Sequence, residues 1–258
     1  MTAVTPESVN LRTTPASAHR IWRVVRLNLV NKWSTIWVPM MIMAFIWLIN
    51  YLIWWIIWLA TAPADRAHAF EGTQWSGGAS YIFVYMLVIG IQVISMTFPF
   101  ALGYSVTRRD FYLGAALTFL LLAAGYSIGF TVLSAIEEAT GGWGLGGHLY
   151  TSIYFGDGGF FSRLFIVFAL MSFFFFTGSI SGTLYMRWRM NGVLVAGAIL
   201  ALIIVGAIAL ITFTSSWPAV GDWFATMGPT GVAVWLLLPT AVAAVAGYFV
   251  ISRATPKS

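Results

Sequence analysis

Six stretches of this chain each have the length and composition of a membrane-crossing helix, and none of them contains Asp, Glu, Lys or Arg. A helix needs about 20 mainly apolar residues to cross a bilayer. Only 8% of the 258 residues are charged, against about 25% in soluble domains, so lipid must cover the surface. The sequence therefore predicts an all-α, polytopic membrane protein. The six predicted spans are Ile36–Ala60, Ala79–Leu102, Tyr112–Ala135, Leu164–Tyr185, Val193–Phe213 and Val232–Ile251.

The basic residues are segregated by these spans. Eleven of the thirteen precede the first span, follow the last, or lie in the loops that join the second to the third and the fourth to the fifth. Arg66 and Arg163 fall on the other side, together with six of the eight acidic residues. Because Lys and Arg concentrate in cytoplasmic loops, both termini are predicted to be cytoplasmic, in a plasma or bacterial inner membrane. Five or seven spans would scramble this segregation.

The segment before the first span divides into two parts. Residues 1–18 are polar and hold two prolines, so we expect a disordered cytoplasmic tail. Residues 19–35 predict an amphipathic helix in the cytoplasmic interface; the alternative is a cytoplasmic extension of the first span. The apolar stripe of this helix is Trp22, Val25, Leu29 and Trp33. Residues 36–251 form the predicted transmembrane domain, and residues 252–258 form a short cytoplasmic tail.

Several classes of catalyst and cofactor binder need residues that this chain lacks. It has no cysteine, which excludes disulfides, thiolate nucleophiles and zinc–thiolate sites. It has no G-x-x-x-x-G-K-[ST] phosphate-binding loop, so it cannot hydrolyse ATP by that route. Its three histidines have no partner at metal-ligand spacing. A G-x-G-x-x-G match at Gly142–Gly147 follows a spanning helix rather than a strand, which disfavours dinucleotide binding. We expect no enzyme activity, no metal or other cofactor on this chain, and no nucleic-acid partner.

Four polar side chains are candidates for a substrate path or an outer gate. Asn50 and Gln92 lie within the first two spans, where hydrogen bonding between helices is favoured over substrate contact. Glu137 and Glu138 follow the third span on the outer side, where they could line an exit or attract a cationic substrate. The alternative for this pair is a helix end that water solvates. The spans hold no Asp, Glu, Lys or Arg, which disfavours a proton-driven machine.

Two G-x-x-x-G patterns lie inside the predicted spans. They are Gly125–Gly129 in the third span and Gly178–Gly182 in the fourth. Such patterns let two helix backbones approach closely. The sequence leaves open whether each packs within one chain or between two chains.

The turn that joins the second and third spans carries a pattern of its own. It reads Phe98-Pro-Phe-Ala-Leu-Gly-Tyr-Ser-Val-Thr-Arg-Arg-Asp-Phe-Tyr-Leu-Gly114, with two arginines before an aromatic pair and Leu-Gly. This stretch resembles the coupling turn in permeases of bacterial ABC-2 type exporters. That family also has six spans, inside termini and an N-terminal elbow helix. One departure is that the longest outer loop here joins the third and fourth spans, whereas many members place it between the fifth and sixth.

The resemblance implies a function and a set of partners. Such a chain is the permease subunit of an exporter and pairs with a second permease, identical or related. Separate ATPase subunits, which bind ATP and Mg²⁺, drive the outward movement of a hydrophobic or amphipathic substrate by alternating access. The residues implied to contact the ATPase are Thr107, Arg108, Arg109, Asp110 and Phe111.

Three other functions stay open. A secondary transporter is disfavoured by the lack of charged residues within the spans. A non-transporting immunity or assembly protein, or an anchor for a sensor, is compatible with everything in the sequence. A membrane enzyme would need a catalytic constellation that is absent. An ATPase that co-purifies with the chain would separate the permease from all three.

Overall fold

The computed structural model describes residues 17–103 and 106–253, and the regular structure of these ranges is helical. An all-α fold is therefore confirmed for the described part of the chain. The tail predicted for residues 1–18 lies almost entirely outside the described residues, as does most of the tail 252–258. Five helical stretches are long and apolar enough to cross a membrane. They are Trp33–Ala60, Arg66–Gly103, Arg108–Ala139, Gly159–Phe213 and Trp217–Ser252.

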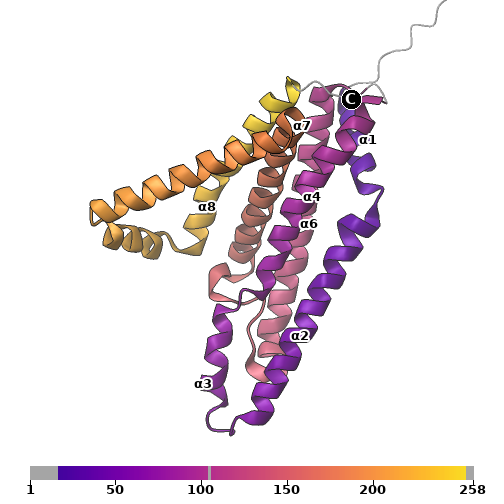
Figure 1. Cartoon of the computed structure of the whole chain (residues 1–258). Helices are drawn as coiled ribbons and strands as arrows, with labels where there is room; N and C mark the ends of the chain where they lie inside the picture. Colours follow the sequence, from indigo (N-terminus) through magenta and orange to yellow (C-terminus); the bar gives the residue numbers. More distant parts are fainter. Residues whose placement is uncertain (1–16, 104–105, 254–258) are drawn as a thin grey trace, which may run out of the picture.

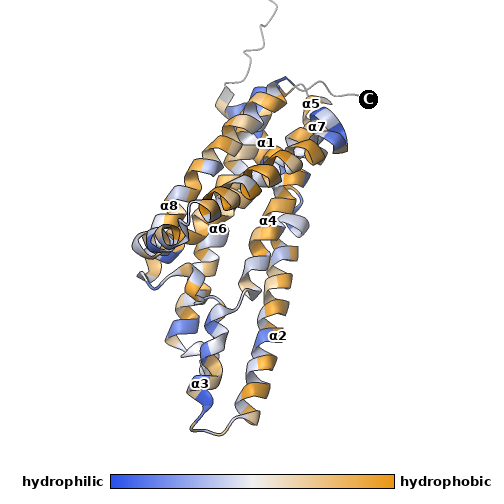
Figure 2. Ribbon diagram, turned by 60° about the vertical axis from the view of Figure 1, so that its left-hand side comes forward, coloured by the Kyte–Doolittle hydropathy of each residue, from blue (hydrophilic) through white to orange (hydrophobic). Residues whose placement is uncertain are grey.

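The helices run back and forth along one bundle (Figure 1). Hydrophilic residues gather mainly toward its ends, and hydrophobic residues cover the helices between them (Figure 2). The α-helices are α1 (Ser17–Leu29), α2 (Val38–Ala60), α3 (Arg66–Glu71), α4 (Tyr81–Gln92), α5 (Phe98–Gly103), α6 (Arg108–Ala139), α7 (Gly159–Phe213) and α8 (Trp217–Ser252). The short π-helical and 3-10 turns are η1 (Trp33–Trp37), η2 (Gly72–Trp75), η3 (Gly78–Ser80), η4 (Val93–Thr97), η5 (Gly142–Gly146) and η6 (Ile153–Phe155).

α7 is 55 residues long and is interrupted at Arg189, whose φ of 58° and ψ of −152° are not helical. A straight helix of this length would extend about 80 Å, well over twice the ~30 Å hydrocarbon core of a bilayer. The chain instead changes direction at Arg189, and the second half of α7 splays away from the bundle (Figure 1). The fourth and fifth predicted spans are the two halves of α7. The described part of the chain thus has five long apolar helices where six separate ones were predicted.

α4 packs closely against the first half of α7. A methyl group placed on Gly90 would collide with the backbone at Phe175, and one placed on Gly178 would collide with the backbone at Leu87. Gly182 approaches α4 closely as well. Because small residues let backbones touch, van der Waals contact replaces the hydrophobic driving force that lipid removes. The pattern Gly178–Gly182 therefore packs within one chain.

α1 lies along the first three turns of α6, and the two helices run in the same direction. The contacts recur every four residues on both helices, a spacing that keeps them on one helix face. They pair Arg20 with Asp110, Val24 with Gly114 and Asn28 with Thr118. At the middle contact, a methyl group on Gly114 would come within 2.5 Å of the Val24 Cβ. The absence of a side chain at Gly114 is what allows the close approach.

The face of α1 that packs matches the predicted apolar stripe only in part, at Val25 and Leu29. Val24, Val25 and Asn28 are buried, whereas Trp22 is 46% exposed. The stripe includes Val25 but not Val24 or Asn28, which pack against α6 and are buried. α1 ends at Leu29, before the π-helical turn η1, so it is a separate helix and not a straight extension of α2.

Candidate functional site

The turn before α6 is shaped by a helix cap. Thr107 has an extended backbone, and its side-chain oxygen accepts a hydrogen bond from the Asp110 amide at 3.1 Å. A threonine in this position satisfies one of the free N–H groups that begin a helix. The carboxylate of Asp110 also suits the positive end of the helix dipole. Local chemistry therefore makes α6 begin at Arg108.

Two arginine contacts join this turn to neighbouring helices. The Nε atom of Arg20 lies 2.8 Å from Oδ2 of the buried Asp110; its N–H is not aligned for a hydrogen bond, so charge holds the pair. Nη1 of Arg108 donates to the carbonyl oxygen of Ser252, at the end of α8, at 3.3 Å. A cation at a helix C-terminus is favourable. The start of α6 is thus tied to both α1 and α8.

The aromatic residues that follow the arginines belong to the core of this chain. Phe111 is fully buried and lies against Phe98, with ring centroids 5.2 Å apart. The Tyr112 hydroxyl donates to the carbonyl of Ala244 on α8 at 2.7 Å. This corrects the expectation that the Phe111 ring is free to contact an ATPase. Of the five residues predicted for that contact, Thr107 and Arg109 are the exposed ones.

Glu137 lies at the opposite end of α6, and the loop that joins α6 to α7 (residues 140–158), called the outer loop after its predicted side, is built around its carboxylate. The side chain is only 1% exposed. Both carboxylate oxygens accept hydrogen bonds from the loop at 2.6 to 3.2 Å. The donors are the indole of Trp143, the consecutive backbone amides of Leu149, Tyr150 and Thr151, and the Thr151 hydroxyl. A buried carboxylate needs such donors, because leaving it without them costs several kcal/mol.

The same loop packs against α2. The Trp143 ring meets Trp47 edge-on, with centroids 5.1 Å apart. Gly147 lies so close to the Trp54 ring that no side chain fits there. Burial raises the pKa of the Tyr150 hydroxyl above its ordinary value, and the negative charge of Glu137 raises it further. The loop that Glu137 holds therefore packs against α2 at Trp47 and Trp54.

Glu138 faces the other way and pairs with a buried arginine. Its Oε1 lies 2.6 Å from Nη2 of Arg163, which is 4% exposed, while Glu138 stays more than half exposed. Arg163 also donates to the Ser134 hydroxyl and to the Gly156 carbonyl. A solvated helix end is therefore the wrong description of Glu137, although it fits Glu138 in part. Attraction of a cationic substrate by this pair stays a prediction.

Among the described residues, neither Asn50 nor Gln92 makes a hydrogen bond to Glu137 or Glu138. Nδ2 of Asn50 donates to the carbonyl of Ile46 in its own helix at 2.9 Å, and Gly78 lies beside it. Gln92 is partly buried and precedes the π-helical turn η4. The hydrogen bond of Asn50 lies within α2, whereas the sequence favours a bond between two helices. A substrate role for either residue stays a prediction.

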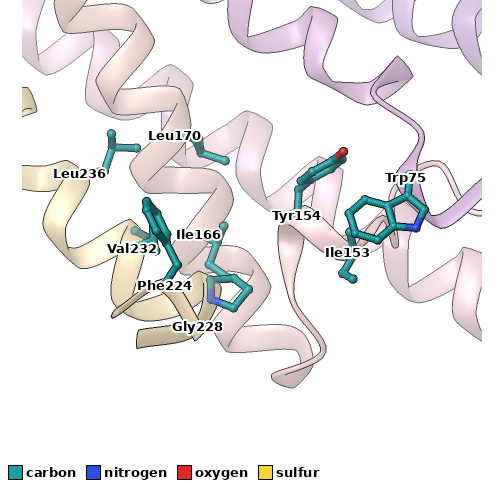
Figure 3. A pocket seen from close by; sticks show the side chains of 11 residues that line it. Trp75, Ile153, Tyr154, Ile166, Leu170, Phe224, Gly228, Val232 and Leu236 are labelled. Atoms are coloured by element: carbon teal, nitrogen blue, oxygen red, sulfur yellow. The ribbon is translucent and has the colours of Figure 1, made fainter. Parts of the chain in front are cut away.

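An apolar pocket of about 350 Å³ lies near the break in α8. Gly228 has a φ of 60° there and is followed by Pro229, so the helix bends. Figure 3 shows Ile166 and Leu170 of α7 on one side of the pocket and Trp75 and Tyr154 on the other. Its lining is almost wholly hydrophobic, so it suits apolar groups and offers no catalytic side chain. Among the described residues, no three His, Asp or Glu side chains gather as a metal site would require.

No protein-family model, curated protein or solved structure matches this chain. In the sequence, Arg20 and Arg163 contribute only to the distribution of basic residues that predicts the orientation of the chain in the membrane. Their partners lie 90 and 25 positions away, at Asp110 and Glu138, and no local spacing marks such a pair.

Proposed function

We propose that this chain is the membrane-spanning subunit of an exporter that a separate ATPase drives. The observation that carries the proposal is the turn before α6. It presents Thr107 and Arg109 outward while Asp110 and Arg108 tie it to α1 and α8. A force applied to this turn would pass into three helices together. This is what a chain without a phosphate-binding loop needs if ATP hydrolysis on a partner is to move it.

The proposed topology follows the charge distribution. We place the end of the bundle that holds α1, the start of α6 and the end of α8 in the cytoplasm, because the basic residues concentrate there. The two halves of α7 each cross the membrane, which makes six crossings in a plasma or inner membrane. α1 would lie at the cytoplasmic end of the bundle, where the ABC-2 permeases have their elbow helix, but it runs alongside the start of α6 and not across it.

The proposed substrate is hydrophobic or amphipathic, and it moves outward by alternating access. The support is the apolar lining of the pocket near Gly228, together with spans that hold no Asp, Glu, Lys or Arg. ATP and Mg²⁺ bind to the partner ATPase, and the permease acts as a pair of identical or related chains. The outer loop that Glu137 holds is the proposed outer gate.

The test is purification of the tagged chain from native membranes, followed by measurement of substrate-stimulated ATP hydrolysis. We expect an ATPase subunit to co-purify. Arg109→Lys should lower stimulated hydrolysis about tenfold, because lysine keeps the charge but lacks the planar fork that binds a carboxylate at two points. Arg187→Lys, at an exposed arginine in the turn between the halves of α7, is the matched control and should leave hydrolysis unchanged.

Two results would contradict the proposal. Hydrolysis that persists after every other subunit has been removed would place the ATPase in this chain. Recovery of the chain without an ATPase would favour a non-transporting immunity or assembly protein, or, if uncouplers stop transport, a secondary transporter.

A further inference from the structure

A cavity of about 180 Å³ lies where α3 and the outer loop meet the end of α2 (Figure 1). Thr73 joins two of its walls, because its hydroxyl accepts a hydrogen bond from the His148 amide at 3.1 Å and donates to the Phe70 carbonyl at 2.7 Å. Glu137 holds the same stretch of the loop, since it accepts a hydrogen bond from the Thr151 hydroxyl at 2.6 Å. The cavity is therefore bounded by parts of the chain that hydrogen bonds hold in place.

One wall of the cavity carries an arginine without an anionic partner. The Cζ atom of Arg66 lies 3.8 Å from the centre of the Trp58 ring, so the guanidinium is held against an aromatic face. Within residues 17–103 and 106–253, the ion pairs do not include Arg66, and its buried Nε has no hydrogen-bond partner. A guanidinium has five N–H donors and suits carboxylate or phosphate oxygens. Arg66 can therefore bind the anionic group of a ligand.

Two hydrogen-bond acceptors line the same cavity. The Thr151 hydroxyl donates its proton to Glu137, so its oxygen accepts from the Nδ1–H of His148 at 2.8 Å. This bond fixes the tautomer of the neutral imidazole and leaves Nε2 as an acceptor. The second acceptor is the carboxylate of Glu71, which is more than half exposed and lies 2.9 Å from Nδ1 of His68. Because both acceptors disfavour a simple anion, the ligand must also carry a donor, and a positively charged donor suits Glu71.

The size of the cavity suits a compact ligand. One water molecule takes about 30 Å³ in the liquid, so the volume corresponds to roughly six waters. The smallest α-amino acids have about as many non-hydrogen atoms. Trp58, Phe70 and Leu145 supply an apolar lining between the charged groups, which suits the carbon atoms that separate the two charges of a zwitterion.

We propose that this cavity binds a small zwitterion, with its anionic group on Arg66 and its primary ammonium group between Glu71 and Nε2 of His148. A free α-amino acid and the phosphoethanolamine headgroup of a lipid share this chemistry. The ligand bridges α3 to the outer loop. The site needs only these two elements and the end of α2, so it does not depend on the proposed export function.

The test is a saturation-transfer NMR titration of the purified chain in detergent. L-Alanine carries both charges, propionate carries only the carboxylate, and ethylamine carries only the ammonium group. Glycerophosphoethanolamine is the lipid headgroup in soluble form. We expect at least one of the two zwitterions to bind about tenfold more tightly than propionate or ethylamine, each of which leaves a charged side chain without its partner. The zwitterion that binds more tightly identifies the source as a free amino acid or a lipid.

Three variants assign the two charges of the ligand. Arg66→Gln should weaken binding of the zwitterion about tenfold, because the anionic group loses its charged partner. Glu71→Gln should reduce the preference for alanine over propionate about fivefold, because the carboxylate that favours the ammonium group is removed. His148→Asn should weaken binding about threefold, since the amide nitrogen of asparagine can replace Nδ1 as the donor to Thr151 but nothing replaces Nε2.

The matched control is Arg187→Gln. Arg187 also lies over a tryptophan ring, that of Trp188, with its Cζ atom 4.4 Å from the ring centre, but it belongs to the turn between the halves of α7. Binding of the zwitterion should be unchanged in this variant. Hydrogen–deuterium exchange of the Leu149 and Thr151 amides checks that the outer loop remains folded in every variant.

Three results would overturn the proposal. Failure of both zwitterions to bind the natural chain at millimolar concentration would mean that the cavity is not a site for them. Binding of propionate as tight as that of either zwitterion would remove the ammonium group from the ligand. Unchanged binding in Arg66→Gln would place the zwitterion elsewhere on the molecule.

Discussion

Glu137 is a charged residue whose role follows from its partners. A carboxylate withdrawn from water is costly unless donors replace the water, and here the loop supplies three amides, a hydroxyl and an indole. The arrangement also orders the loop, because three consecutive amides converge on one oxygen, Oε1. Glu138, the next residue, takes part in none of these bonds and instead pairs with Arg163. Adjacent glutamates therefore have different functions.

Removal of the Glu137 carboxylate should release the loop. In Glu137→Ala, the amides of Leu149, Tyr150 and Thr151 lose their acceptor, which costs about 3 kcal/mol for groups bonded to a charge. Hydrogen–deuterium exchange of these amides should accelerate about 100-fold. Glu138→Ala is the control and should leave their exchange unchanged. Equal protection in both variants would show that the loop is held by something other than Glu137.

At the scale of elements, glycine decides how close two helices lie. Gly90 and Gly178 face each other's helices across the α4–α7 contact, and Gly114 receives Val24 of α1. Gly125 and Gly129 have the same sequence pattern as Gly178–Gly182 but face open space. The pattern alone therefore permits close packing without determining it.

Alanine substitution should separate the two patterns. Gly178→Ala forces a methyl group against the backbone at Leu87 and should cost about 1–3 kcal/mol through overpacking. Gly125→Ala meets no neighbour and should stabilise α6 by up to about 1 kcal/mol through helix propensity. Thermal unfolding in detergent measures both. A similar loss of stability in the two variants would argue that Gly125 is packed too.

The contact of α1 with α6 can be broken at one residue. In Gly114→Val, the added side chain collides with Val24, so α1 should detach. Trypsin should then cleave after Arg23 and Arg26 at least tenfold faster, because a detached helix opens more often. Gly221→Val, at a helical glycine with free space around it, is the control. An unchanged cleavage rate in Gly114→Val would mean that α1 stays attached by its other contacts.

At the scale of the whole molecule, α6 connects the two ends. Its 32 residues extend about 48 Å, enough to cross a bilayer with a turn or more to spare at each side. Its first turn is joined to α1 and α8, and its last turn holds the outer loop through Glu137. A single helix therefore connects the contacts at the two ends of the bundle.

The number of crossings can be tested with single cysteines, since the chain has none. Asn191→Cys lies just after the break at Arg189, and Gly221→Cys lies near the start of α8. If both halves of α7 cross, an impermeant thiol reagent should label Gly221→Cys and Gly72→Cys in intact cells but leave Asn191→Cys protected. Equal labelling of Asn191→Cys and Gly221→Cys would place both on one side and reduce the number of crossings.

Much of the fold could be read from the sequence because membrane helices have a strong local signal. Each predicted span lies largely within a long helix of the structure, apart from the division of α7 at Arg189. The candidate site was predicted less well. Thr107 and Arg109 are exposed, but Phe111 is buried and Glu137 is enclosed by the loop. Whether an aromatic ring faces a partner or the core depends on helix packing, which has no local signature.

By itself, the sequence determined the helical class, the approximate ends of the helices and the segregation of basic residues. These follow from the length of apolar runs and from charge, properties that each segment carries alone. Only the tertiary structure decided that Glu137 holds the outer loop, that Arg20 pairs with Asp110 and that Gly178 packs while Gly125 faces open space. Each of these depends on which distant backbone arrives beside the residue, and that is set by the packing of all the helices together.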